Sequence, residues 1–579
     1  MTIDKKDFMI CLFIAVASLF IFTNGLNVHG FEFRDDEVFY FKSTNEMIQS
    51  GDIMSPKYFS ENRFQKPILF YWFILLSYKL FGISWFSARF VSCLFASGTL
   101  VVTWLMTKSL FNRKIAYLST LILLTVPLFF RHAKNAVPDG ALNFFIALAL
   151  YFFVRFLLEK HAYRYSLFFF IACALGFMVK GFAAIIVPFL TIILYSMCRR
   201  EWKILKDMRF FMGIALMFLI ISPWFIYMIK QYGTDYVNYM WNHETSDRLL
   251  KVDRDNFFWV KMKDFLQHMV FYIQIILQQF APWSFLSLLG FGLAISVTGK
   301  TKLESDPIVF MLSWVFVVYF FFSFMYFTIS HYMLVMSVPV AVLTSYFLLY
   351  PFETKDFWQQ FLTFFRKYYV LFAFTVLTIV YSFILIFFGY LPIFGICIIA
   401  VIFVLSLSII LRSQSLFVGP MMLGLLIALI GYQTAYLSGL GLTNHTTLRK
   451  FAQTIDHGEL KNYAIGIGSH DLHENELQIY FKDVKIEKYA NDTDDYTRYM
   501  LSQLFGKNES VYCLITEKDY NKYLKDTVKN GQIIQQEFML RKQLNLDAEF
   551  LKALLRFDRR EIYEYFMENV ILVKREFNV

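Results

Sequence analysis

Long apolar segments recur along the chain from residue 8 to about residue 437, and short polar stretches separate them. A helix needs about 20 apolar residues to cross the hydrocarbon core of a bilayer. The segments that reach or approach this length predict about thirteen membrane spans. They fall near residues 8–28, 84–107, 115–131, 140–158, 166–180, 182–198, 210–229, 271–297, 308–327, 331–350, 368–388, 391–411 and 416–437.

The pattern of the chain changes after residue 437. The stretches YAIGIG, VKIEKY and VYCLIT are typical of short strands, and residues 495–505, 517–526 and 548–557 are typical of helices. The expected fold class is therefore a polytopic α-helical membrane protein with a small C-terminal α/β domain outside the membrane. The expected domains are residues 1–437 and 438–579.

Charge and composition orient these segments. The chain is 57% hydrophobic and 20% aromatic, as expected of a multi-pass membrane protein. Residues 438–579 hold 20 basic and 22 acidic residues, which leaves 35 and 23 upstream. The basic excess thus belongs to the membrane part, where it favours contact with anionic lipids rather than nucleic acid. By the positive-inside rule we expect a cytoplasmic N-terminus and an extracytoplasmic C-terminal domain. The expected location is the cytoplasmic (inner) membrane, with the C-terminal domain in the periplasm.

This orientation places most polar candidates for chemistry in three outer loops, residues 29–83, 131–139 and 230–270. The first loop contains FRDDEVFY, in which Asp35 and Asp36 follow an apolar segment closely. A carboxylate at a membrane interface is partly desolvated and lies near cations, which suits a general base. The alternative is an ordinary solvated loop end.

Other candidates also have a structural alternative. Lys66, beside Pro67, is placed to contact a phosphate or to anchor an interfacial helix by snorkelling. Asp139 could be a first-turn residue favoured by the helix dipole, and Arg131 a simple flanking charge.

The histidines are weaker signals. His243 stands beside Glu244, but two ligands without a third at a recognisable spacing do not predict a metal site. His331, at the start of a predicted span, could bind substrate or cap a helix. The sequence has no phosphate-binding glycine loop and no HExxH pattern, so it indicates no nucleotide-driven pump, no metalloprotease and no cofactor. A divalent metal is possible but is not indicated.

A series of short motifs resembles one family. In order, the chain contains DDEVFY, QSGDIMSP, FQKPILFYW, KLFG, NAVPDG, GFMVKGFAAIIVP, WNHETSDRL and SHYMLVMSVP, between about residues 25 and 345. No single motif is specific, but the ordered series resembles membrane glycosyltransferases of the GT-C type. It is most similar to the aminoarabinose lipid A transferases and their relatives, the protein O-mannosyltransferases.

The resemblance implies roles for several residues. Asp36 matches the family's catalytic acid, with Asp35 beside it, and Lys66 matches the lysine that contacts the donor phosphate. Phe39 and Gln65 depart from the family's Arg and Glu, which argues against copying the aminoarabinose specificity. The residues that we expect to bind substrate are Lys66, Asp139, Tyr40, Lys180, Arg131, His243 and His331.

The expected reaction follows from this resemblance and from general chemistry. A single sugar would pass from a polyprenyl-phosphate donor to lipid A or another envelope glycolipid or glycan at the outer face, with inversion at C1 and an Asp base. Alternatives on the same scaffold are a protein O-glycosyltransferase and a glycan ligase. A lipid or glycolipid transporter is the alternative from another class, but it should carry polar groups at the bilayer midplane rather than at one interface.

Overall fold

The computed structural model describes most of the chain in two compact units. One unit, the helical unit, comprises Met1–Asn24 and Ser43–Tyr432, and the second comprises Gly25–Lys42 and Gln433–Val579. The described residues are 4–26, 35–242, 257–298, 302–326, 328–351, 357–387, 404, 406, 408, 415–438, 444–456, 463–469, 472, 486–490, 494–507, 510–525, 532–540, 556 and 567–575.

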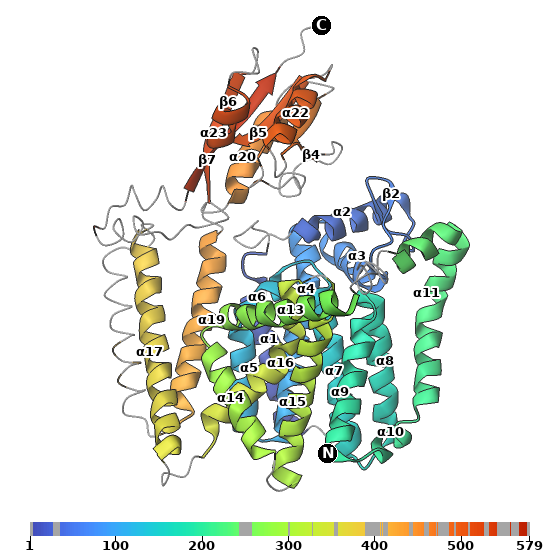
Figure 1. Ribbon diagram of the computed structural model, residues 1–579, viewed down its shortest axis with the longest axis vertical. Helices are drawn as coiled ribbons and strands as arrows, with labels where there is room; N and C mark the ends of the chain where they lie inside the picture. Colours follow the sequence, from blue (N-terminus) through green and yellow to red (C-terminus); the bar gives the residue numbers. More distant parts are fainter. Residues whose placement is uncertain are drawn as a thin grey trace. The chain divides into compact units, whose positions relative to one another are not determined.

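The helical unit is built from long helices packed side by side (Figure 1). Two helices cross the unit boundary: α2 begins in the second unit and α19 ends there. A small hairpin pairs β1 (Lys57–Tyr58) with β2 (Glu61–Asn62). The helices are α1 (Lys5–Thr23), α2 (Asp35–Ser50), α3 (Leu69–Phe81), α4 (Trp85–Leu110), α5 (Arg113–Thr125), α6 (Pro127–Lys134), α7 (Asp139–Leu158), α8 (Tyr163–Lys180), α9 (Ala183–Arg199), α10 (Lys203–Asp207), α11 (Phe210–Tyr239), α13 (Phe257–Gln279), α14 (Ser284–Val297), α15 (Lys302–Ser323), the 3₁₀ helix η3 (Ser330–Met336), α16 (Ser337–Leu349), α17 (Phe357–Phe387) and α19 (Val418–Ser438).

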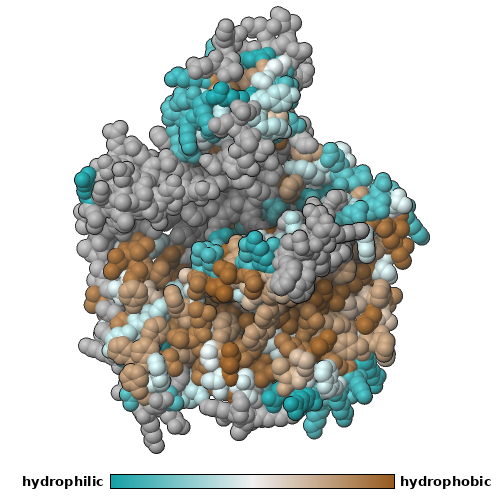
Figure 2. All heavy atoms as spheres, viewed as in Figure 1, coloured by the Kyte–Doolittle hydropathy of each residue, from teal (hydrophilic) through white to brown (hydrophobic). Residues whose placement is uncertain are grey.

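Length and apolar composition make this a multi-pass membrane protein. Among the described residues, eight helices are long and apolar enough to span a membrane, or ten if each of two bent pairs forms one span. Hydrophobic side chains cover the middle of the helical unit, and hydrophilic ones gather toward its ends (Figure 2). The number thirteen stays a prediction, because the segment 391–411 lies almost wholly outside the described residues.

Two predicted spans are bent pairs of helices in the structure. The segment 115–131 bends by 66° between α5 and α6, and the segment 271–297 is part of a pair bent by 119° between α13 and α14. Proline explains both breaks: Pro127 and Pro282 lack a backbone N–H and disfavour helical geometry in the residue before them. Val126 accordingly has extended backbone angles. Figure 1 shows α13 lying across the bundle.

Ion pairs identify one end of the helical unit. Asp7 at the start of α1 pairs with Lys108 at the end of α4, and it accepts from Arg113 Nη2 at 2.9 Å at the start of α5. At the C-terminus of α16, Arg366 Nη1 donates to the carbonyl of Tyr350 at 2.8 Å. Lys108, Arg113 and Arg366 lie in connections between predicted spans, at residues 108–114 and 351–367.

The second unit contains a five-stranded sheet in the order β4-β3-β5-β7-β6. β3 is parallel to β4 and β5, whereas β7 is antiparallel to β5 and β6. The predicted strands and helices at 463–468, 484–489, 511–516, 495–505 and 517–526 have counterparts here, but β6, β7 and α20 were not predicted, and 548–557 lies almost entirely outside the described residues. The elements are β3 (Tyr463–Ile467), β4 (Glu487–Lys488), β5 (Ser510–Thr516), β6 (Gln532–Leu540), β7 (Met567–Arg575), α20 (Asn444–Asp456), α22 (Asp494–Phe505) and α23 (Glu517–Tyr523).

Close packing of α14 against α16 gives a prediction for stability. A Cβ added at Gly290 would lie 2.9 Å from the backbone oxygen of Leu343, whereas one at Gly292 would meet nothing within 4 Å. A backbone carbonyl cannot rotate away, so Gly290→Ala should destabilise the protein by about 1–3 kcal/mol. Gly292→Ala, the matched control, should be neutral or stabilising by up to about 1 kcal/mol. Thermal unfolding in detergent, followed by tryptophan fluorescence, measures both; equal stability of the two variants would contradict the packing argument.

Candidate active site

A buried ion pair joins the start of α7 to the end of α8. Lys180 Nζ lies 2.5 Å from Asp139 Oδ1, and the two side chains are only 13% and 7% exposed. Removing one partner of such a pair leaves a buried charge and typically costs about 3–5 kcal/mol. Asp139 is thus more than a first-turn acid favoured by the helix dipole, because it holds the ammonium group of Lys180 in a defined position.

Two histidines complete this cluster. His331 Nε2 lies 3.4 Å from Asp139 Oδ1. The rings of His132 and His331 have centroids 5.9 Å apart, and His132 is only 2% exposed. His132, Asp139 and His331 each offer a ligand atom, and these atoms all lie within 4.8 Å of one another. Among the described residues the cluster therefore combines a carboxylate, an ammonium group and two imidazoles.

Local sequence explains why these side chains meet. The break at Pro127 turns α6 away from the direction of α5 and carries His132 toward the start of α7. Gly140 allows the close approach of the two elements, because a Cβ there would lie 3.3 Å from the backbone oxygen of His132. Gly181 ends α8 with a φ of 95°, a conformation that glycine adopts without strain, just after Lys180.

His331 reaches the cluster from a 3₁₀ helix. It is the second residue of η3, which directly precedes α16 and packs against α6, α7 and α15. Its neighbour Tyr332 stacks on Phe322 of α15, with ring centroids 4.5 Å apart. Sequence reasoning placed His331 among the substrate-binding candidates but missed His132. The available signal was its position in the same short outer loop as Asp139.

The loop that carries Lys66 is braced by polar and aromatic contacts. Glu46 accepts hydrogen bonds from the backbone N–H groups of Phe59 and Ser60, at 2.9 and 3.1 Å. Phe64 packs edge-on against tyrosines of α11, with Tyr236 at a centroid distance of 5.3 Å. Such contacts hold the backbone on both sides of the loop.

Lys66 is partly buried at the end of this braced segment, and its Nζ donates to the carbonyl of Gln65 at 3.0 Å. It lies shortly before α3, which packs against α4 and α8. The backbone at Lys66 is therefore held by the packed segments on either side of it.

The remaining predicted residues lie on α2, on α6 or outside the described part of the chain. Asp36 is exposed on the first turn of α2, and Tyr40 is buried on the same helix. Asp35 opens α2, and its side chain lies outside the described part of the chain. Arg131 precedes His132 on α6. His243 lies outside the described residues.

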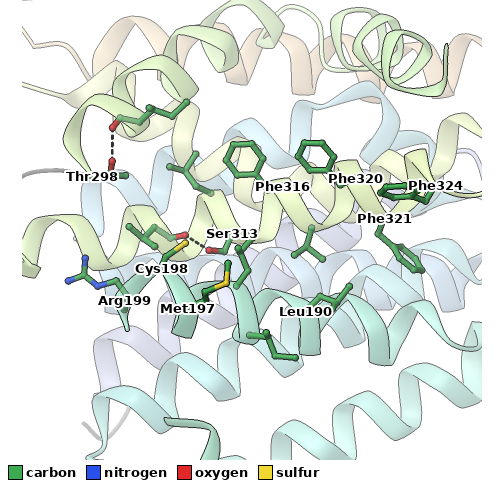
Figure 3. A pocket seen from close by; sticks show the side chains of 16 residues that line it. Leu190, Met197, Cys198, Arg199, Thr298, Ser313, Phe316, Phe320, Phe321 and Phe324 are labelled. Atoms are coloured by element: carbon green, nitrogen blue, oxygen red, sulfur yellow. Dashed lines mark hydrogen bonds between the residues drawn. The ribbon is translucent and has the colours of Figure 1, made fainter. Parts of the chain in front are cut away.

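An apolar groove runs along the helical unit between α9 and α15 (Figure 3). Its volume is about 1040 Å³, and α14 and the residue after it contribute to its wall. Polar side chains in the wall have partners of their own: Thr298 and Ser313 donate to carbonyls of Ile295 and Val309, at 2.7 and 2.8 Å. Such a groove suits a lipid chain and offers little to a sugar. Its lining includes Leu190, Ile193, Met197, Leu312, Phe316, Phe320 and Phe324.

Comparisons with known proteins agree with this fold. A family model described as dolichyl-phosphate-mannose-protein mannosyltransferase matches residues 65–227. The crystal structure of ArnT from Cupriavidus metallidurans bound to undecaprenyl phosphate is similar over 97% of each chain, with a TM-score of 0.64 and 16% sequence identity. At this identity the structural similarity shows the fold alone.

Curated relatives match part of the chain in sequence. An undecaprenyl phosphate-alpha-4-amino-4-deoxy-L-arabinose arabinosyl transferase from Serratia proteamaculans is 28% identical over 327 residues, 54% of each chain. An uncharacterized protein from Aquifex aeolicus is 29% identical over 342 residues, 59% of this chain and 62% of the relative. The matches thus span between about half and three-fifths of these relatives. The resemblance predicted from the ordered motifs is confirmed: this chain has the fold of the GT-C glycosyltransferases and is related in sequence to those of the aminoarabinose transferase type.

Proposed function

We propose that this protein is a glycosyltransferase that moves a single sugar from a polyprenyl-phosphate donor to a lipid or glycan acceptor. The observation that carries the proposal is the family match over residues 65–227, which includes Lys66, Asp139 and Lys180. The names of the curated relatives and the GT-C fold support the same reaction class. Lipid A or another envelope glycolipid is the proposed acceptor.

The chemistry requires a base and a site for the departing phosphate. The acceptor hydroxyl oxygen attacks C1 of the sugar, the bond from C1 to the phosphate oxygen breaks, and polyprenyl phosphate leaves. Asp36 takes the hydroxyl proton, and Lys66 stabilises the negative charge that grows on the phosphate. A single displacement inverts the configuration at C1.

The cluster at the start of α7 supports this chemistry by fixing a second cation. Asp139 binds the Lys180 ammonium at 2.5 Å and so holds it in one orientation at that end of the helical unit. A positioned cation needs little reorganisation when charge develops on a substrate. The apolar groove offers a surface for the lipid part of the donor.

Other readings of the same scaffold are a protein O-glycosyltransferase and a glycan ligase, and a lipid transporter belongs to another class. Mass spectrometry of envelope lipids and glycans from a strain lacking the protein distinguishes them. Loss of a single sugar from a lipid supports the proposal, loss from a protein or loss of a whole glycan supports the first two alternatives, and a lipid retained on the wrong leaflet supports a transporter.

Asp36→Asn should abolish detectable transfer, because an amide keeps the shape of the carboxylate but does not accept the proton. Loss of a general base typically lowers the rate by about 10²- to 10⁴-fold. Transfer measured at equal protein level should be much less affected by Asp35→Asn. Near-normal turnover of Asp36→Asn with an inactive Asp35→Asn or Asp139→Asn would show that another residue is the general base. Normal turnover of all three variants would refute the proposal that the protein is a glycosyltransferase.

Lys66→Ala should lower transfer by about tenfold to a hundredfold, because a charge-assisted contact to phosphate contributes about 1.5–3 kcal/mol. Lys79→Ala, which removes an exposed lysine from α3, is the matched control and should retain activity. Initial rates of both variants in detergent or liposomes test the assignment. Equal rates of the two variants would indicate that Lys66 anchors an interfacial helix and does not contact the donor phosphate.

We further propose that the N-terminus is cytoplasmic and that the second unit faces the periplasm. A reporter that is active only outside the cytoplasm, fused after Val579, should therefore be active. Activity of a cytoplasm-only reporter at the same position would reverse the orientation.

A further inference from the structure

The cluster at the start of α7 has the composition and spacing of a metal site. Zinc takes nitrogen and oxygen ligands at about 2.0–2.1 Å, which places neighbouring ligands of a tetrahedral site about 3.3–3.4 Å apart. His331 Nε2 and Asp139 Oδ1 already lie 3.4 Å apart. The ligand atom of His132 lies within 4.8 Å of both.

A backbone hydrogen bond prepares His132 as a ligand. Its Nδ1 lies 2.8 Å from the carbonyl oxygen of Leu128. A carbonyl only accepts, so Nδ1 carries the proton and Nε2 of the neutral ring carries the lone pair. Histidines that bind metals commonly donate their other ring N–H to a carbonyl or carboxylate in this way, which sets both the tautomer and the ring orientation.

Lys180 is the group that opposes a metal ion here. Its ammonium lies 2.5 Å from the Asp139 oxygen that also faces His331. A divalent ion between Asp139 and His331 would repel this ammonium strongly, because both charges would lie in a poorly solvated place. The metal ion and the Lys180 ammonium therefore each weaken the binding of the other to the Asp139 carboxylate.

We propose that His132, Asp139 and His331 form a binding site for a divalent transition metal ion of the zinc type, and that the ion competes with the Lys180 ammonium for the Asp139 carboxylate. Two imidazoles and one carboxylate suit zinc, with a fourth position for water or an anion. The bound ion would tie α6, α7 and η3 together. The inference does not depend on sugar transfer, so either can fail while the other stands.

Metal binding to the purified full chain tests this directly. The protein carries an affinity tag without histidine and is stripped with a chelator, and it is then titrated with Zn²⁺ or with Co²⁺. We expect stoichiometric Zn²⁺ by elemental analysis and the visible absorption of four-coordinate Co²⁺. Failure of the wild-type protein to bind either ion would overturn the proposal without any variant.

Single substitutions assign the ligands. His132→Gln, Asp139→Asn and His331→Gln should each lower the affinity at least tenfold and remove the Co²⁺ absorption. His161→Gln is the matched control: His161 Nδ1 pairs with Asp207 Oδ2 at 2.5 Å, another histidine–carboxylate pair in the same unit. Binding that survives in all three ligand variants, or is lost equally in His161→Gln, would place the ion elsewhere and overturn the site.

Lys180→Met tests the competition. Removing the ammonium should tighten Zn²⁺ binding by about tenfold or more, because the carboxylate no longer has a cationic partner. Unchanged or weaker binding would overturn the competition. Size-exclusion profiles of all variants show that each protein remains folded when its affinity is measured.

Discussion

The hydrocarbon core of a membrane offers no hydrogen bonds, and this constraint governs where polar groups lie in the protein. Backbone groups must pair within helices, and buried hydroxyls must find acceptors close by. Thr99, Thr103 and Ser119 satisfy this need by donating to carbonyls four residues earlier in their own helices, at 2.7 to 2.9 Å. Polar side chains that are to act on a substrate are then left to the ends of the helices.

Charged side chains form different arrangements at the two ends of the helical unit. At one end, Asp7, Lys108 and Arg113 tie the starts and ends of neighbouring helices together. At the other, Asp139 holds Lys180 in a nearly buried pair beside two histidines. The first arrangement stabilises the bundle. The second gathers a carboxylate, an ammonium group and two imidazoles in one place.

Proline and glycine residues position the side chains of this second arrangement. The break at Pro127 brings His132 beside the start of α7, and Gly181 lets α8 stop directly after Lys180. The first outer loop is held independently, by Glu46 and by the tyrosines that surround Phe64. The residues that we propose to contact the donor thus stand on packed segments, as a site needs when its groups must be in place before the substrate arrives.

The sequence alone locates most membrane helices, because a run of about 20 apolar residues has few other stable states in a bilayer. The predicted segments 84–107 and 140–158 correspond closely to α4 (Trp85–Leu110) and α7 (Asp139–Leu158). It also identified Asp139, Lys180 and His331 as candidates from their motifs. That these three residues meet, and that His132 joins them, is seen only in the folded protein. Asp139 lies 41 residues from Lys180 in the chain, so their contact depends on the packing of α7 against α8. The position of His132 depends on the bend at Pro127, whose direction local sequence does not encode.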